Sequence, residues 1–340
     1  MITLGIESSC DECAAAVVED GKKILSNVVA TQIPFHKEFA GVVPEIASRK
    51  HTEWIYGVVE EALRQAGKTP RGIDGVAATA RPGLLGSLLV GLTFAKSFAW
   101  AMRIPFLACN HMLAHLYAAR LCEDNPPYPY LGLLVSGGHT IICRVDDFDT
   151  VEVMGTTIDD AAGEAFDKVA KHYDLGYPGG VYIDEAAKKG DEGAFDFPMP
   201  NLHKGEHQFD VSYSGLKTAV INQLEQFRRK GKAGEINVND VAASFQKTAV
   251  EILLRALFRA CQSSGIKTVV SGGGVAANSY LRRRLALQGG VDCVFPPPEL
   301  CGDNGAMVAG IACQYFLRGE SSPLSETACA RVKEFRRRYP

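Results

Sequence analysis

The sequence predicts a mixed α/β fold in which one arrangement of strands, glycine-rich turns and helices occurs twice. Three glycine-rich turns, at residues 4–11, 131–140 and 269–274, each follow an apolar run typical of a strand. The order strand, turn, strand, helix, strand, glycine loop, helix is also the same in both halves of the chain. Because backbone without a Cβ approaches phosphate closely, three such turns indicate a nucleotide-binding protein.

In the first half, the elements are marked by clear changes of hydrophobic period. Residues 3–18 predict a strand, a turn and a second strand, and apolar side chains over residues 51–66 recur at helical spacing. A strand over 75–80, a loop at Pro82-Gly83 and a long apolar helix over 84–101 follow. Together they predict one strand-rich lobe with its own helices.

The second half repeats this plan. Two strands are predicted within residues 130–145, followed by helical segments over 161–172 and 241–262. A strand over 267–271 then enters a glycine loop, and a helix begins near residue 277. A duplicated plan of this kind predicts two lobes whose glycine loops line one nucleotide cleft.

The division into domains follows from the same elements. We expect an N-terminal lobe of residues 1–125 plus about 300–340, and a C-terminal lobe of residues 126–299. The proline-rich stretch 125–129 is the predicted connection, because proline continues neither a helix nor a strand ladder. Residues 190–209 are predicted to be an irregular insertion, and long irregular segments are usually functional.

Composition limits the class of protein. The chain has 340 residues, of which 46% are hydrophobic and 22% charged, with a formal net charge of −3, as in ordinary globular proteins. The negative balance argues against a protein that coats nucleic acid through its overall field. We find no basic leader with an apolar core and no apolar run of membrane-spanning length, so we expect a cytoplasmic protein without membrane contact.

His111 and His115 lie one helical turn apart, a spacing that allows both imidazoles to bind one metal ion. The alternative is a pair of partly exposed helix histidines. Asp303 is the candidate third ligand, with a helix N-cap as its alternative role. Two histidines and one carboxylate suit iron or catalytic zinc. Met112 stands where a zincin protease has its general base, which excludes that class.

Several longer motifs together resemble one known family. They are Gly5-Ile6-Glu7-Ser8-Ser9-Cys10-Asp11-Glu12, Gly41-Val42-Val43-Pro44-Glu45, Asn110-His111 through His115, Leu134-Val135-Ser136-Gly137-Gly138-His139-Thr140, Asp159 through Lys168, Tyr177-Pro178-Gly179-Gly180, Tyr213 through Thr218 and Gly273 through Asn278. From residue 2 to about 320, the chain resembles the TsaD family of tRNA threonylcarbamoyladenosine transferase subunits, formerly called glycoproteases.

This resemblance implies an actin-like ATPase fold, shared with sugar kinases and heat-shock ATPases, with two duplicated RNase-H-like lobes around a nucleotide cleft. It implies transfer of the threonylcarbamoyl group from threonylcarbamoyl-adenylate to N6 of adenosine 37, in the anticodon loop of tRNAs that read codons beginning with A. AMP is released. The implied partners are a paralogous subunit, TsaB, and a small ATPase, TsaE.

The resemblance also assigns roles to individual residues. His111, His115 and Asp303 correspond to ligands of one divalent metal, generally Fe²⁺, although Zn²⁺ also suits the set. The positions that correspond to the nucleotide-binding hairpin are Leu134, Val135, Ser136, Gly137 and Gly138. Those that correspond to contacts with the ribose and base are Asp167, Gly180, Asp184 and Asn278.

Each of these residues has an ordinary structural alternative. Asp167 and Asp184 are also compatible with solvated helix carboxylates, and Gly180 and Asn278 with turn residues. Asp11, at the first glycine turn, is our candidate general base or orienting carboxylate, and its alternative is an Asx turn. Clustered arginines and lysines are candidate contacts to RNA phosphates, at Arg49, Lys50, Lys217, Arg282, Arg283, Arg284 and Arg336 to Arg338.

The chain departs from the family pattern in four places. Leu113 stands where the metal motif usually has an acidic residue, and Arg81 where a glycine usually precedes Pro82-Gly83. Cys13 replaces a threonine, and residues 326–340 match poorly.

Two other functions remain open on the sequence. A phosphotransferase of the same fold needs a Mg²⁺ site without histidines, so the histidine pair argues against it. A nucleotide-binding scaffold without catalysis is the second alternative.

Overall fold

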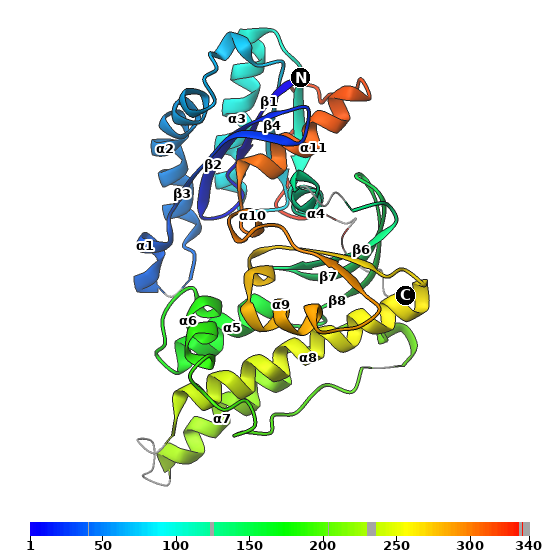
Figure 1. Cartoon of the computed structure of the whole chain (residues 1–340). Helices are drawn as coiled ribbons and strands as arrows, with labels where there is room; N and C mark the ends of the chain where they lie inside the picture. The colour runs from blue at the N-terminus through cyan, green and yellow to red at the C-terminus, as the bar shows by residue number, and fades with distance from the viewer. Residues whose placement is uncertain (40, 123–125, 203, 230–235, 333–334, 336–340) are drawn as a thin grey trace. The chain divides into compact units, whose positions relative to one another are not determined.

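The computed structural model describes residues 1–39, 41–122, 126–202, 204–229, 236–332 and 335. These residues form two compact units. Unit 1 comprises Met1–Pro127, Asp147–Thr150 and Phe295–Phe335, and unit 2 comprises Tyr128–Asp146 and Val151–Val294. Figure 1 labels most of the helices and strands of both units.

Unit 1 is built on a five-stranded sheet with the order β3-β2-β1-β4-β5. The strands β3, β2 and β1 are antiparallel to one another, and β1, β4 and β5 are parallel. The elements of the unit are β1 (Ile2–Glu7), β2 (Glu12–Glu19), β3 (Lys23–Thr31), α1 (Ile33–His36), η1 (Lys37–Phe39), α2 (Pro44–Gln65), η2 (Pro70–Gly72), β4 (Gly75–Arg81), α3 (Leu85–Met102), β5 (Phe106–Asn110), α4 (His111–Tyr117), η3 (Ala118–Leu121), α10 (Pro298–Cys301) and α11 (Gly305–Leu317).

Helices cover both faces of this sheet. α2 and α3 pack on one face, where Leu4, Ile6 and Val76 are completely buried in a core shared with Ala62 and Leu92. α11 packs on the opposite face against β1 and β2. Figure 1 shows the sheet between these helices. A strand that is covered on both faces has no exposed side, which explains why β1 and β4 are buried over almost their whole length.

Gly5 sets how closely α11 approaches the sheet. A Cβ on this residue would lie 2.3 Å from the backbone nitrogen of Ala309, in the second turn of α11. Only glycine therefore allows this contact between β1 and the helix. The contact brings the end of β1 and the start of α11 close together, and the residues discussed below lie at these two ends.

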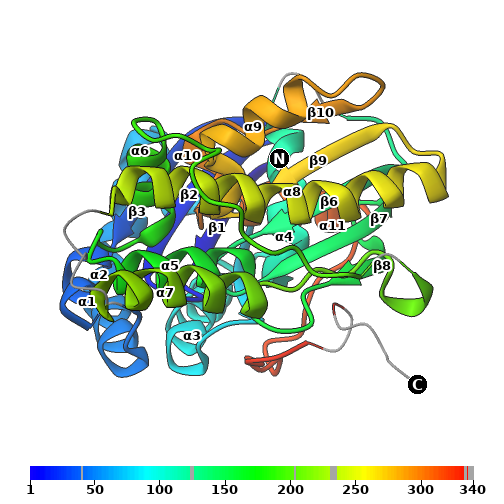
Figure 2. The ribbon, with the colours of Figure 1, turned by 90° about the horizontal axis from the view of Figure 1, so that it is seen from below.

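Unit 2 contains a second five-stranded sheet with the same plan. Its order is β10-β9-β6-β7-β8, in which β6 and β7 are antiparallel and β6, β9 and β10 are parallel. Figure 2 shows α5, α7 and α8 running beside one another in this part of the chain. The elements are β6 (Tyr130–Val135), β7 (Thr140–Asp147), β8 (Thr150–Thr156), α5 (Ala162–His172), α6 (Gly179–Ala187), η4 (Gly205–His207), α7 (Ser214–Arg229), α8 (Val238–Ser264), β9 (Thr268–Gly272), η6 (Gly274–Ala277), α9 (Ser279–Ala286) and β10 (Asp292–Val294).

The predicted duplication is confirmed by the two matching sheets. Two strands in each half were not predicted from the sequence, β3 and β5 in the first and β8 and β10 in the second. All four are edge strands: β3 and β8 have half-exposed side chains, and β5 and β10 are only five and three residues long, so none gives the long apolar run expected of an inner strand. The helix expected from residue 51 begins earlier, at Pro44, because proline is favourable in a first helical turn.

One helix bears on the expectation of no membrane contact. α3 is long and apolar enough to cross a membrane by length and composition, with a mean hydropathy of 1.4 over its 18 residues. It is the one helix of the described residues that meets this test. It packs against α2 and β4, and a single helix of this kind is weak evidence for a membrane span.

Candidate metal centre and nucleotide cluster

The two histidines begin α4, directly after β5. The side chain of Asn110 caps the helix by accepting a hydrogen bond from the Met112 amide at 2.9 Å. His111 and His115 follow at a spacing of four residues, and their rings meet edge to face with centroids 4.5 Å apart. Both are buried, so the alternative of partly exposed helix histidines is wrong.

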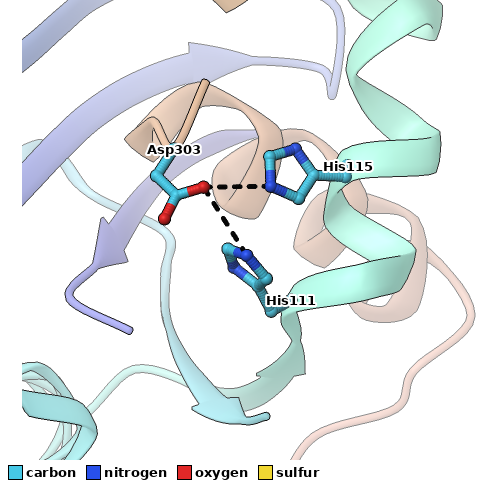
Figure 3. A group of neighbouring side chains, drawn as sticks. All are labelled: His111, His115 and Asp303. Atoms are coloured by element: carbon cyan, nitrogen blue, oxygen red, sulfur yellow. Dashed lines mark hydrogen bonds and ion pairs between the residues drawn. The ribbon is translucent and has the colours of Figure 1, made fainter. Parts of the chain in front are cut away.

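Asp303 meets both histidines from the loop between α10 and α11. Its Oδ1 lies 3.0 Å from Nε2 of His115 and 3.5 Å from Nε2 of His111. Figure 3 shows the three side chains converging, with the Asp303 carboxylate facing both rings from one side. All three belong to unit 1, so they meet within one compact unit.

Asn304, the neighbour of Asp303, caps α11, which was the alternative role considered for Asp303. The N-cap of α11 is Asn304, whose side-chain oxygen accepts from the Met307 amide at 3.0 Å. The Asn304 amide also donates to the carbonyls of Gly302 and Leu300, at 2.9 and 3.3 Å. Asp303 is therefore not needed as the cap, and its carboxylate is directed toward the imidazoles.

These three residues form a group that could hold one metal ion. One ligand atom from each lies within 4.8 Å of the other two, and both histidines are buried. Two imidazole nitrogens and a carboxylate oxygen are a normal ligand set for a divalent transition metal. The prediction that the three residues converge is therefore supported by the geometry.

The surroundings of His111 include a residue to which the sequence analysis gave no role. Glu7, the last residue of β1, has no exposed surface, and its Oε2 lies 3.0 Å from Nδ1 of His111. The Thr79 hydroxyl donates to the same oxygen, and the Ser9 amide donates to Oε1 at 2.6 Å. Glu7 belongs to the first glycine-rich motif, but its partner lies 104 residues away, so the motif alone did not reveal the contact.

His111 and Glu7 each shift the pKa of the other. Burial opposes a charge on His111, but the carboxylates of Asp303 and Glu7 outweigh this and raise the pKa of His111 to about 9. Burial also acts to raise the pKa of Glu7, whereas the charge and hydrogen bond of His111 lower it overall. In the metal-free protein, the two side chains therefore form a buried ion pair.

Asp11 lies half-buried at the turn between β1 and β2. Its neighbour Glu12 is a second carboxyl group there, and burial together with the charges of Asp11 and Asp303 raises the pKa of Glu12 well above its usual range. The backbone of this turn is held by His51, whose Nε2 lies 3.0 Å from the carbonyl oxygen of Cys10. Burial is also the main reason that the pKa of Cys10 is raised and that of Cys13 reaches about 12, so neither thiol is ionised at neutral pH.

In unit 2, the predicted nucleotide hairpin is a tight turn between β6 and β7. The Ser136 amide donates to the His139 carbonyl at 2.8 Å, and the Ser136 carbonyl accepts from the Gly163 amide at the start of α5. Gly137 and Gly138 are exposed, and a Cβ on either would meet nothing within 4 Å. Their backbone is therefore accessible to a ligand.

The four other predicted nucleotide residues are linked through α6. Asp167 on α5 accepts from the Gly179 amide at 2.7 Å, next to Gly180. Asp184, which lies on α6 five residues after Gly179, accepts from the Asn278 side chain at 3.3 Å. A Cβ on Gly180 would meet nothing within 4 Å. The two aspartates are thus hydrogen-bonded rather than simply solvated.

Two further residues join this cluster. Ser279 donates to Asp184 at 2.7 Å, and the buried Gln246 accepts from Asn278 at 3.0 Å. Neither was predicted, since a single serine or glutamine within a helix carries no sequence signal. Asn278 also caps α9 by accepting from the Leu281 amide at 3.0 Å.

Most of the candidate RNA-contacting cations already have partners. Carboxylates pair with Arg49, Lys50, Lys217 and Arg284. Arg283 lies over the Tyr280 ring, with its guanidinium carbon 4.9 Å from the ring centroid. Arg336 to Arg338 lie outside the described residues.

The departures from the family pattern have different surroundings. Leu113 is half-buried on α4, and Cys13 is completely buried in the core of unit 1. Arg81 forms an ion pair with Glu326, in the C-terminal segment that matched the family poorly.

Comparison with known proteins identifies relatives over the whole chain. The family described as "TsaD: tRNA N6-adenosine threonylcarbamoyltransferase" matches residues 23–310. A protein of that name from Treponema denticola is 63% identical over 335 residues, which are 98% of each chain. The corresponding protein of Treponema pallidum strain Nichols is 54% identical over 99% of this chain and 95% of its own, and that of Borrelia hermsii is 49% identical over 99% and 98%.

Solved structures support the fold at low sequence identity. HypF of T. kodakarensis superimposes with a TM-score of 0.61 at 15% identity, over 94% of this chain and 48% of its own. Component A of the Acidaminococcus fermentans (R)-2-hydroxyglutaryl-CoA dehydratase gives a TM-score of 0.52 at 16% identity, over 92% and 97%. These likenesses confirm the predicted actin-like ATPase fold. With relatives that match over nearly their full length, the chain belongs to the TsaD family of tRNA N6-adenosine threonylcarbamoyltransferases.

Proposed function

We propose that this chain transfers the threonylcarbamoyl group from threonylcarbamoyl-adenylate to N6 of adenosine 37 in tRNAs that read codons beginning with A, with release of AMP. Family membership over almost the entire chain supports this activity. The observation that carries the proposal is the buried convergence of His111, His115 and Asp303. A phosphotransferase would have no use for this group, because phosphoryl transfer relies on Mg²⁺ held by oxygen ligands.

The same three residues would hold one divalent metal ion, with Fe²⁺ as the expected metal and Zn²⁺ as the alternative. Their donor atoms suit either ion, and the site has no glutamate in the position that a zincin protease uses as its base. When bound, the metal supplies a Lewis acid that polarises substrate oxygens. The burial of both imidazoles supports this role, since it keeps water from competing for them.

Residues of unit 2 would bind the adenylate. We assign phosphate binding to the hairpin from Leu134 to Gly138, because the exposed amides of Gly137 and Gly138 have no side chain in the way. Negative charge develops on this phosphate as AMP leaves, so amide donors lower the barrier. We assign the ribose and base to Asp167, Gly180, Asp184 and Asn278, which are linked through α6.

A proton must leave N6 of the adenosine during transfer. We propose Asp11 as the acceptor or as the carboxylate that orients the amine, because it lies half-buried at the first glycine turn. Glu12, whose raised pKa favours the neutral acid, is less suited to accept a proton at neutral pH. The anticodon loop is a suitable substrate, because an unpaired base is extruded at low cost.

We expect the partners of this activity to be TsaB, TsaE and tRNA, and we expect the protein in the cytoplasm. The exposed apolar side chains of α3, Leu85, Leu89 and Trp100, support a protein interface on this helix. Because carboxylates pair with four of the six candidate cations within the described residues, we expect partner subunits to contribute part of the tRNA surface.

The test is a transfer assay with purified chain, its partner subunits, threonylcarbamoyl-adenylate and unmodified tRNA, read by mass spectrometry of the nucleosides. His111→Ala and Asp303→Ala are expected to lose bound metal and activity together while folding survives. His172→Ala is the matched control, because it removes a half-buried imidazole of unit 2 that pairs with Glu225. Unchanged transfer by folded His111→Ala would favour a scaffold role, and phosphorylated product from ATP would favour a kinase.

A further inference from the structure

Glu7 has the features of a side chain that orients another residue. Its carboxyl group is completely buried at the end of β1, where a charge without a partner would cost several kcal/mol. Among the described residues, its only ion-pair partner is His111. Its two oxygens accept from the Ser9 amide, the Thr79 hydroxyl and the imidazole.

We infer that Glu7 is a positioning residue, which holds the His111 ring with Nδ1–H toward Glu7 and Nε2 toward the ion between His111, His115 and Asp303. The inference rests on the metal site of the proposed function. An ionised carboxylate only accepts hydrogen bonds, so the imidazole nitrogen 3.0 Å from it must carry the proton. Deprotonation of the ring for metal binding then leaves the lone pair on Nε2, the atom that lies 3.5 Å from Asp303.

The second histidine lacks such support. Nδ1 of His115 is buried and has no hydrogen-bond partner among the described residues. Leu113, on the same helix, stands where the family motif usually has an acidic residue. The carboxylate that orients a metal-binding imidazole in this chain thus comes from β1, across the fold, and acts on His111 alone. Such outer partners set ring orientation and raise ligand basicity.

A direct catalytic role for Glu7 does not fit its position. Both carboxylate oxygens already accept hydrogen bonds, and the side chain has no exposed surface through which a substrate amine could reach it. General-base catalysis needs contact with the proton that is removed. Glu7 therefore acts through His111.

The experiment measures Co²⁺ binding to the purified full-length metal-free chain, by competition with a chromophoric chelator and by the visible spectrum. Glu7→Gln is nearly isosteric, and its amide donates to Nδ1 of His111, which favours the tautomer with the proton on Nε2. In the folded variant, we expect Co²⁺ affinity to fall about 10- to 100-fold with an altered spectrum. Asp210→Asn is the matched control, because Asp210 is a buried carboxylate bonded to Nδ1 of His207 at 2.9 Å, outside the candidate centre.

A measurement on the unmutated protein covers the case in which Glu7→Gln fails to fold. In the Zn²⁺-bound chain, ¹⁵N NMR of the histidine rings is expected to show a proton on Nδ1 of His111, protected from exchange. Metal bound through Nδ1, or a Glu7→Gln variant with unchanged Co²⁺ affinity, would overturn the inference while leaving the transferase proposal intact. A wild-type chain that binds no Co²⁺ would overturn both the metal site and the inference, whereas loss of transferase activity with normal Co²⁺ binding would affect only the proposed reaction.

Discussion

Asp303 and Asn304 are adjacent residues with separate tasks, and this separation is testable. Asn304→Ala removes the cap of α11, in which a side-chain oxygen accepts from the Met307 amide, so we expect a loss of about 1–2 kcal/mol in the free energy of unfolding. Asp303→Ala removes no cap and is expected to lower metal affinity more than about 100-fold with little change in metal-free stability. Urea unfolding and Co²⁺ titration of both variants measure the two effects, and equal effects of the two substitutions would contradict this division.

The sequence predicted part of this site. The four-residue spacing of His111 and His115 made a shared ion one of two alternatives, with Asp303 as the candidate third ligand, and the resemblance then assigned the ligand role to all three residues. Spacing did not separate a ligand from a cap, because Asp and Asn are both preferred N-cap residues and the two stand side by side. Glu7 could not be assigned, since its contact with His111 depends on how β1 and α4 meet in the folded chain.

At the scale of elements, the position of α11 against β1 decides the site, since Asp303 precedes the helix and Glu7 ends the strand. Gly5→Ala would place a Cβ 2.3 Å from a backbone nitrogen of α11, and a backbone cannot move away as a side chain can. We expect a loss of about 3 kcal/mol or more in the free energy of unfolding, together with weaker metal binding. Gly57→Ala is the control, because Gly57 lies exposed within α2 with open space around it.

The control substitution Gly57→Ala is expected to change the free energy of unfolding in the opposite direction. In an exposed helix interior, alanine is favoured over glycine, so Gly57→Ala should raise the free energy of unfolding by about 0.5–1 kcal/mol and leave metal binding unchanged. Thermal unfolding and Co²⁺ titration of both variants provide the comparison. A Gly5→Ala variant as stable as the parent would show that α11 does not need the glycine for its approach.

The start of α7 gives a prediction that depends on pH. Asp159 accepts from the Tyr213 and Ser214 amides at 2.8 and 3.3 Å. Burial acts against the charge, but the hydrogen bonds of Ser212, Tyr213 and Ser214 outweigh it and lower the pKa of Asp159. A carboxyl group with a lowered folded-state pKa stabilises the protein above its unfolded value near 3.9, and this contribution is lost as the pH falls through the folded value.

Asp159→Ala is therefore expected to cost about 1 kcal/mol at pH 7, and this difference should shrink as the pH is lowered below about 4. Urea unfolding of the parent and the variant between pH 7 and pH 3 measures it. Asp146→Ala, which removes an exposed ion pair with Arg144, should cost less than about 0.5 kcal/mol. A cost for Asp159→Ala that stays constant with pH would show that the ionised carboxylate is not what stabilises the start of α7.

For the whole molecule, the repeat of elements along the sequence was sufficient to predict two lobes of the same fold. The glycine turns and apolar runs that define the repeated order of elements are local features, so they can be recognised in the sequence of each half. The four edge strands β3, β5, β8 and β10 were missed because they are half-exposed or short and lack such runs. Contacts between distant segments could not be predicted either. Arg81 and the C-terminal segment, two departures from the family pattern, are joined by the ion pair between Arg81 and Glu326.

The C-terminal segment of unit 1 contacts the edge strand β5 and its neighbour β4. The Ser322 amide donates to the Phe106 carbonyl of β5 at 2.7 Å, and the Cys329 amide donates to the Ala80 carbonyl of β4 at 2.9 Å. Between them, Glu326 pairs with Arg81 and its carbonyl accepts from Lys96. The segment thereby covers backbone groups that an edge strand would otherwise expose.

This segment is expected to stabilise the loop that follows Arg81, in which the Leu84 amide donates to the Ser9 carbonyl at 2.8 Å. In a double-mutant cycle, Arg81→Gln and Glu326→Gln should show a coupling energy of about 0.5–1 kcal/mol, because the pair is two-thirds buried, with exposures of 32% and 31%. The exposed pair Lys23 and Glu19 is the control and should couple by less than about 0.5 kcal/mol. Hydrogen exchange should also quicken at the Gly83 amide, which donates to the Ala330 carbonyl at 3.3 Å. Additive single substitutions with unchanged exchange would mean that the segment lies on the loop without holding it.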